Sequence, residues 1–239
     1  MKLTYVFHSC FVIETDNISI IIDYYKDAPN NTEGVTHQEL AKNEKHIYVL
    51  STHSHADHFN PEILGWKEKY PNIKYIFSSD ILHERLAKQN DAVYMNKLDI
   101  YEDDTLKVKA FGSTDIGISF LIEVEGKKIF HAGDLNNWHW KDESTPEEIS
   151  EAEKYYLDEL SLLAQSANHL DLAMFPVDSR LGSDYMLGAK QFLDKIEADV
   201  FAPMHFGLEY DKANAFESYA EKKNSRFFAI KQKGQSIDF

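Results

Sequence analysis

The sequence predicts an α/β protein built from two mixed sheets with helices on their outer faces. Three features indicate this: apolar, β-branched runs come first, helices and strands then alternate, and strands followed by helices recur in the second half. A purely parallel, doubly wound sheet fits this order less well. Because no low-complexity linker interrupts the chain, we expect a single domain over residues 1–239.

The first half opens with short runs rich in Ile, Val, Phe and Tyr, which predict strands. Residues 18–22 are apolar at four of five positions, as in a strand buried on both faces. Thr36 is a candidate cap for a short helix ending near Asn43, and Pro71 ends a later helix. The predicted strands are 3–7, 10–14, 18–23, 47–50 and 73–77, and the predicted helices are 36–43, 61–70 and 80–88.

The second half contains the clearest local signals. Glu125-Gly126 lies between two apolar runs and predicts a hairpin turn. Thr145 and Glu148 form a capping box, with Pro146 at the first helical position of a helix that continues to about Ala167. The other predicted elements are strands at 106–111, 118–124, 128–131, 170–176, 199–202 and 226–230, and helices at 185–196 and 211–223.

The composition limits the partners and the compartment. Lys and Arg number 25 against 40 Asp and Glu, a net charge of −15, so we expect no nucleic-acid partner. A local metal cluster could still attract an anion. The single cysteine, Cys10, excludes an intramolecular disulfide and fits a reducing compartment. Residues 1–5 lack a signal-peptide pattern and no run approaches the roughly 20 apolar residues of a membrane span, so we expect a soluble, cytoplasmic protein without a membrane partner.

Residues 52–58, here called the histidine segment, hold three histidines and one aspartate directly after a predicted buried strand. Imidazole and carboxylate groups bind divalent transition metals, and strand ends commonly carry sites. In an extended segment, His53 and His55 would point to one side, while Asp57 and His58 would serve a second ion. The alternative is a solvated polar loop. This density of ligands favours a metal centre.

The pattern His-x-His-x-Asp-His at 53–58 is the signature of the metallo-β-lactamase superfamily, which this chain resembles along nearly its whole length. His8-Ser9-Cys10-Phe11, His131-Ala132-Gly133-Asp134 and Pro203-Met204-His205-Phe206 occur in the order found in the branch containing L-ascorbate-6-phosphate lactonase. The resemblance implies a four-layer αββα sandwich with a dinuclear metal site. It further implies that His53 and His55 bind the first metal, that Asp57, His58 and His205 bind the second, and that Asp134 bridges them.

The first metal lacks an obvious third ligand. Many members of the superfamily supply a histidine between the signature and the bridging aspartate, but here the interval from His58 to His131 contains only His83, in a predicted helix. Asp115 is a candidate replacement, and an added carboxylate would make Mn or Fe plausible beside Zn. It could equally be a turn residue, which would leave the first site weak or empty. We therefore expect one or two ions per chain.

Further residues are candidates for substrate contact or for orienting the ligands. Each has a structural alternative: a histidine satisfied by backbone groups, a tryptophan covering a core edge, or a surface ion pair. Arg180, together with Asp178, follows a predicted strand, and its guanidinium would suit an anionic substrate. The candidates are His8, His131, Trp138, His139 and Arg180.

Hydrolysis is the chemistry most natural to such a site, because metal ions lower the pKa of a bound water. Asp57 would orient that water or act as its base. The expected partner is a small-molecule substrate with a lactone, ester, amide or phosphodiester bond, and the position of Arg180 would suit an anionic one. A homo-oligomer is also compatible with the sequence. The alternatives are a diiron redox enzyme and a non-catalytic binding protein on the same fold.

Overall fold

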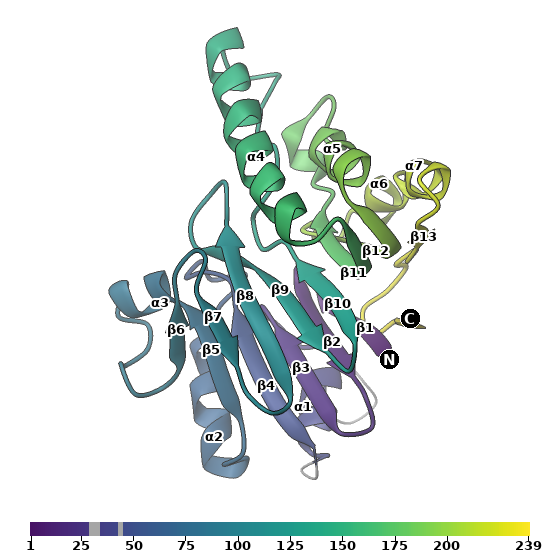
Figure 1. Ribbon diagram of the computed structural model, residues 1–239. Coiled ribbons are helices and arrows are strands. Elements are labelled where there is room, and N and C mark those ends of the chain that lie inside the picture. The colour runs from purple at the N-terminus through teal and green to yellow at the C-terminus, as the bar shows by residue number, and fades with distance from the viewer. Residues whose placement is uncertain (29–33, 43–44) are drawn as a thin grey trace. The chain divides into compact units, whose positions relative to one another are not determined.

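The computed structural model divides into two compact units, each with one seven-stranded mixed sheet flanked by helices (Figure 1). This confirms the fold class of two mixed sheets with helices, while the single domain over residues 1–239 stays a prediction. Unit 1 comprises Met1–Asn96 and Lys231–Phe239, and unit 2 comprises Lys97–Ile230. The structure describes residues 1–28, 34–42 and 45–239, and no helix within these ranges is long and apolar enough to cross a membrane.

The sheet of unit 1 is antiparallel from β14 to β3 and parallel from β3 to β6, in the order β14-β1-β2-β3-β4-β5-β6. All five residues of β3 are buried, as the sequence predicts for a central strand. The chain ends meet at one edge, where the Met1 amino group donates to the Phe239 carbonyl at 3.2 Å. The strands are β1 (Lys2–Phe7), β2 (Cys10–Glu14), β3 (Ile18–Ile22), β4 (His46–Ser51), β5 (Lys74–Ser78), β6 (Val93–Met95) and β14 (Ser236–Asp238).

The helices of unit 1 are shorter than the sequence patterns suggest. Gly34, and not Thr36, occupies the N-cap position of the first one, and the amides of Thr36 and His37 donate to the Asp27 carboxylate. The end predicted near Asn43 lies outside the described residues. The predicted helix 80–88 ends at His83, because Arg85 adopts a left-handed backbone (φ 61°) that an α-helix cannot contain. The predicted helix 61–70 begins as a 3₁₀ turn. The helices are α1 (Val35–Leu40), η1 (Pro61–Gly65), α2 (Trp66–Lys69) and α3 (Ser79–His83).

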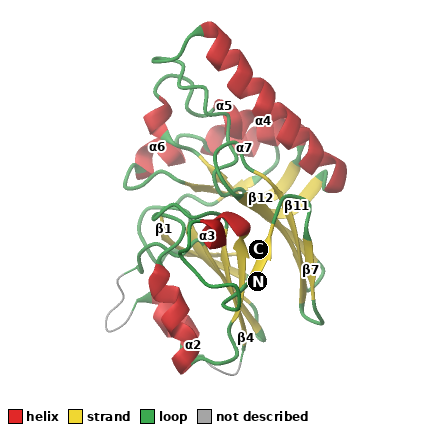
Figure 2. Ribbon diagram, turned by 90° about the vertical axis from the view of Figure 1, so that its left-hand side faces the viewer, coloured by secondary structure: helices red, strands yellow, loops and turns green. Residues whose placement is uncertain are grey.

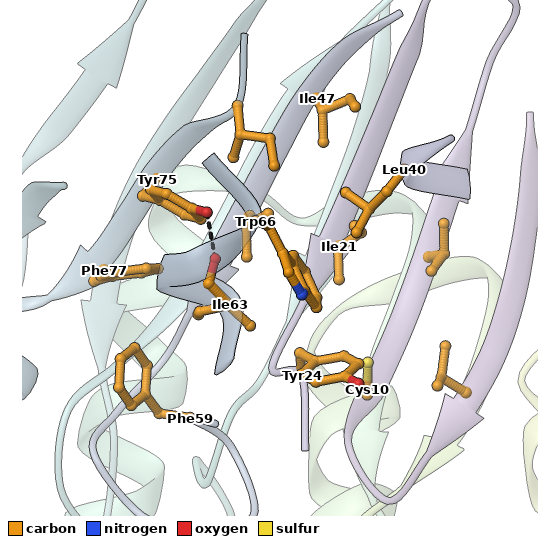
Figure 3. Packing of buried hydrophobic residues seen from close by; sticks show 14 of the residues in the cluster. Cys10, Ile21, Tyr24, Leu40, Ile47, Phe59, Ile63, Trp66, Tyr75 and Phe77 are labelled. Atoms are coloured by element: carbon orange, nitrogen blue, oxygen red, sulfur yellow. Dashed lines mark hydrogen bonds between the residues drawn. The ribbon is translucent and has the colours of Figure 1, made fainter. Parts of the chain in front are cut away.

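The core of unit 1 lies under these helices (Figure 3). Trp66 of α2 packs edge-on against Tyr24, with ring centroids 4.8 Å apart. The Tyr75 hydroxyl donates to the Ile63 carbonyl, which ties β5 to η1. Each large side chain buried in this way contributes about 1.5–3 kcal/mol. This packing holds the carboxyl ends of β3 and β4 on a rigid base.

The sheet of unit 2 repeats the plan of unit 1, antiparallel from β7 to β10 and parallel from β10 to β13. The predicted hairpin at Glu125-Gly126 is confirmed, and both residues have positive φ angles (48° and 78°). The strands are β7 (Ile100–Glu102), β8 (Leu106–Gly112), β9 (Ile118–Val124), β10 (Lys127–His131), β11 (His169–Pro176), β12 (Glu197–Met204) and β13 (Arg226–Phe227).

The helices of unit 2 include the longest described one, α4, which lies beside α5 near β11 and β12 (Figure 2). Its predicted capping box is confirmed, since Thr145 and Glu148 bond reciprocally. The predicted helix 211–223 is broken before Phe216, whose ring is fully buried 4.9 Å from that of Phe201. The helical elements are α4 (Pro146–Ser166), η2 (Ser179–Leu181), α5 (Leu187–Lys195), α6 (Tyr210–Asn214) and α7 (Glu217–Lys222).

Candidate metal centre

The histidine segment follows β4 and forms a turn instead of an extended chain. The amides of His58 and Phe59 both donate to the His55 carbonyl at 2.9 Å. This turn still brings His53 and His55 together, with His53 Nε2 3.1 Å from His55 Nδ1. His53 is fully buried and its ring centroid lies 4.1 Å from that of His58. Three imidazole rings are therefore gathered at one strand end.

A second group of donor atoms in unit 1 consists of His8, Asp57 and His58, whose ligand atoms lie within 4.8 Å of one another. His8 comes from the tight link between β1 and β2 and has a left-handed backbone (φ 59°). Its amide donates to the Tyr5 hydroxyl at 2.9 Å, and its Nε2 lies 3.3 Å from Asp57 Oδ2. A non-glycine residue in this conformation is unusual and is often held in place at functional sites.

The hydrogen bond with His8 holds the pKa of Asp57 well below its ordinary value, against the opposing effect of burial. The positive charge of nearby His58, when that ring is protonated, lowers this pKa further. Asp57 is therefore a carboxylate at neutral pH. In that state it can bind a cation or accept a hydrogen bond from water.

Asp23 is part of this site, although its sequence position did not suggest it. The side chain is fully buried at the carboxyl end of β3 and accepts three hydrogen bonds of 2.7 Å, from the amide and hydroxyl of Thr52 and from His58 Nδ1. A carboxylate has no proton to give, so the proton of this pair is on Nδ1 of His58. Nε2 then carries a lone pair, the state that a metal ligand needs.

Unit 2 places Asp134 and His205 side by side. Asp134 follows β10 after Gly133, whose left-handed backbone (φ 54°) turns the chain, and its Oδ1 lies 3.3 Å from His205 Nε2. His205 follows β12 directly and is itself left-handed (φ 63°). Both side chains are buried. A buried carboxylate oxygen and an imidazole nitrogen thus face one another at two strand ends.

Behind His205 lies a second carboxylate. Asp178, two residues after the end of β11, accepts hydrogen bonds from His205 Nδ1 at 2.9 Å and from Arg180 Nη2 at 2.6 Å. Burial would raise the pKa of Asp178, but these hydrogen bonds outweigh it and lower the pKa to about 2. Asp178 therefore stays ionised, and His205 is held by it as His58 is held by Asp23. Arg180 contacts the carboxylate that orients His205.

The remaining candidates occupy less central places. Both ring nitrogens of His139 contact backbone, at Lys141 N and Asp184 O, and His131 Nδ1 accepts from the Gly133 amide at 3.2 Å. The Trp138 ring lies 5.5 Å from that of His205. Asp115 lies in the exposed loop between β8 and β9, and its amide bonds to Ser113. Its ligand role stays a prediction, and this placement fits the turn alternative.

The donor set fits a divalent transition metal. In each unit, imidazole nitrogens and carboxylate oxygens converge, and the donors from His53, His58, Asp134 and His205 are buried. Zn, Mn and Fe all accept such mixed nitrogen and oxygen ligands. The paired carboxylates behind His58 and His205 match the second layer that metal-binding histidines normally have.

Comparison with known proteins identifies the family. A model described as the Beta-lactamase superfamily domain matches residues 2–150. A UPF0173 metal-dependent hydrolase from Desulforamulus reducens is 24% identical over 262 residues, covering 99% of this chain and 99% of that protein.

Two solved structures show the same fold. Igni18, a metallo hydrolase from the archaeon Ignicoccus hospitalis, is 19% identical with a TM-score of 0.69, covering 100% of this chain and 98% of that one. CmlA, a diiron β-hydroxylase from Streptomyces venezuelae, is 14% identical with a TM-score of 0.66, covering 100% of this chain and 54% of that one. Because the family model spans more than half of the sequence, this chain belongs to the metallo-β-lactamase superfamily.

Proposed function

We propose that this protein is a metal-dependent hydrolase that cleaves a small substrate with an activated water molecule. The observation that carries the proposal is the pairing of histidine with a buried carboxylate in each unit. Asp23 fixes His58 and Asp178 fixes His205, so that each ring presents Nε2 as a ligand. A solvated polar loop would have no need of such support.

The residues have distinct roles in this proposal. His53, His55, Asp57, His58, Asp134 and His205 would hold one or two ions, as the family resemblance implies. A bound Zn, Mn or Fe ion lowers the pKa of water and polarises the bond under attack. Asp57, kept ionised by His8, accepts a hydrogen bond from the attacking water and orients it. Its low pKa makes it a weak base, so orientation is its main contribution.

The class of bond is set by what this chemistry supports. A lactone, ester, amide or phosphodiester each has an electrophilic centre that water can attack and an oxygen that a cation can polarise. A lactone is included because the motifs of this chain resemble those of the L-ascorbate-6-phosphate lactonase branch. The relatives named as metal-dependent hydrolases agree with this general reaction.

The test begins with the metal content of protein purified without chelator. We expect Zn, Mn or Fe at one or two equivalents per chain, and turnover of at least one member of a lactone, ester, amide and phosphodiester panel. Asp57→Ala should lose at least 100-fold in kcat/KM, whereas Asp16→Ala, at an exposed turn, should retain wild-type activity.

Three results would contradict the proposal. One is wild-type turnover by metal-loaded Asp57→Ala. Another is a metal-loaded wild-type protein that cleaves nothing in the panel, which would favour a binding protein. The third is bound iron with reductant-dependent oxygen consumption and no hydrolysis, which would favour a diiron redox enzyme.

A further inference from the structure

Unit 2 contains a cavity of about 400 Å³ at the start of α4. Three segments form it: the loop after β8, the chain after β10, and the first half of α4. Such a volume accommodates part of a small-molecule substrate. The lining residues are Thr114, Trp138, Glu148, Glu151, Ala152 and Tyr155.

The cavity adjoins the candidate metal ligand Asp134. Trp138 Nε1 donates to the Asp134 carbonyl at 2.7 Å, and Thr114 Oγ1 lies 3.4 Å from the same oxygen. The Trp138 ring is also 5.5 Å from the ring of His205. Trp138 and Thr114 thus contact both the backbone of this candidate ligand and the cavity, so the cavity lies beside the candidate metal ligands of unit 2.

The walls of the cavity combine aromatic rings with negative charge. Tyr155 is about half exposed, but its hydroxyl donates to the Ser113 carbonyl at 3.0 Å, which holds the ring in place. Glu148 Oε2 accepts from the amide and hydroxyl of Thr145, and these bonds lower the pKa of Glu148, so it stays ionised. Neither Glu148 nor Glu151 forms an ion pair with any residue that the structure describes.

We propose that this cavity is a substrate subsite for an ammonium group. The inference rests on the proposed hydrolase function, since it names the charge of the substrate for that site. Organic cations bind over the faces of Trp and Tyr within about 6 Å of the ring centre, and adjacent carboxylates add attraction. No Lys or Arg lines the cavity to compete for the carboxylates. The sequence position of Arg180 suggested an anionic substrate, but its guanidinium donates hydrogen bonds to the Asp178 carboxylate.

Binding of choline and of its neutral isostere 3,3-dimethylbutan-1-ol tests the charge requirement directly. We expect the Trp138 indole N–H signal to shift on titration with choline, and the alcohol to bind about tenfold more weakly. Glu151→Gln should weaken choline binding about fivefold, and Tyr155→Leu about three- to fivefold. Glu147→Gln is the matched control, because it removes an equal charge from the same exposed turn outside the cavity.

Equal affinity for choline and the alcohol would overturn the subsite, as would equal effects of Glu147→Gln and Glu151→Gln. Measuring binding without and with added Zn²⁺ separates this proposal from the hydrolase proposal. Choline binding by metal-loaded protein that cleaves no ester, lactone, amide or phosphodiester would contradict hydrolysis and still support the subsite. Conversely, hydrolysis of 3,3-dimethylbutyl acetate and acetylcholine at equal kcat/KM would support hydrolysis and overturn the subsite.

Discussion

Replacing Asp23 with Asn tests whether a buried carboxylate prepares His58 to bind metal. The amide has almost the same shape, but its NH₂ group can only donate. Where that group faces His58 Nδ1, the ring must accept, and its proton moves to Nε2. The nitrogen that should bind the metal is then protonated, so we expect metal affinity to fall about 10- to 100-fold.

The cost in stability follows from the three hydrogen bonds of 2.7 Å that reach the Asp23 carboxylate. A hydrogen bond to a charged group contributes about 1.5–3 kcal/mol, roughly twice a neutral one. With its NH₂ group in the place of Oδ2, an asparagine keeps only the bond from the Thr52 amide, while its two N–H groups can donate to His58 Nδ1 and Thr52 Oγ1. These neutral bonds and a lower desolvation cost offset part of the loss. We therefore expect the metal-free protein to lose about 2–3 kcal/mol in free energy of unfolding, or about 5–10 °C in Tm.

Competition with a chromophoric chelator measures the Zn²⁺ affinity, and long-range ¹H–¹⁵N NMR identifies the protonated ring nitrogen of His58. Asp16→Asn, in an exposed turn, is the control and should match wild type in both measurements. A folded Asp23→Asn protein with wild-type affinity and a proton still on Nδ1 would show that the Asp23 carboxylate does not set the state of His58.

Three further predictions concern metal and stability. Dialysis against EDTA should abolish activity and lower Tm by about 5–10 °C, with both restored by Zn²⁺, as calorimetry and turnover can check. Burial raises the pKa of Glu14, but hydrogen bonds with Glu39, Lys2 and Lys42 outweigh it and lower the pKa to about 2. The ionised Glu14 carboxylate therefore stabilises the fold above about pH 4.5, and this stabilisation is lost as the pH falls toward 2. In urea unfolding, Glu14→Gln should lower the free energy of unfolding by about 2 kcal/mol at pH 6, and this difference from wild type should shrink toward zero as the pH falls toward 2. Thr145→Ala should cost about 1 kcal/mol by removing the cap of α4, and an unchanged urea midpoint would argue against the capping box.

The central elements of the fold were predictable because their signals are local. The five apolar-rich strands of the first half and the capping box of α4 need no distant partner to be recognised. The edge strands β6, β7 and β14 were missed, because each has only three residues, too few to show the alternation of a strand. The helix at 80–88 was overestimated, since sequence propensity gives no sign that Arg85 turns left-handed.

In the candidate site, too, the residues of a local motif were predictable and a residue brought in by strand pairing was not. The histidine segment is visible because four potential ligands within six residues are rare in a loop. Asp23 is 35 positions from His58, and a lone aspartate after a strand resembles an ordinary turn residue. Only the parallel pairing of β3 with β4 places it beside that ring. The signal that could have found it is an acidic residue directly after a buried strand that is apolar at four of five positions.

The recurrence of one arrangement in two units points to topology as the cause of ligand orientation. Neighbouring parallel strands lie about 4.8 Å apart, so the residues that follow them emerge side by side. In unit 1, β3 supplies Asp23 and β4 leads to His58, while in unit 2, β11 supplies Asp178 and β12 leads to His205. Each carboxylate is buried and would be costly there without a partner. A change that shifted β3 against β4, or β11 against β12, would therefore misorient a ligand as effectively as removing it.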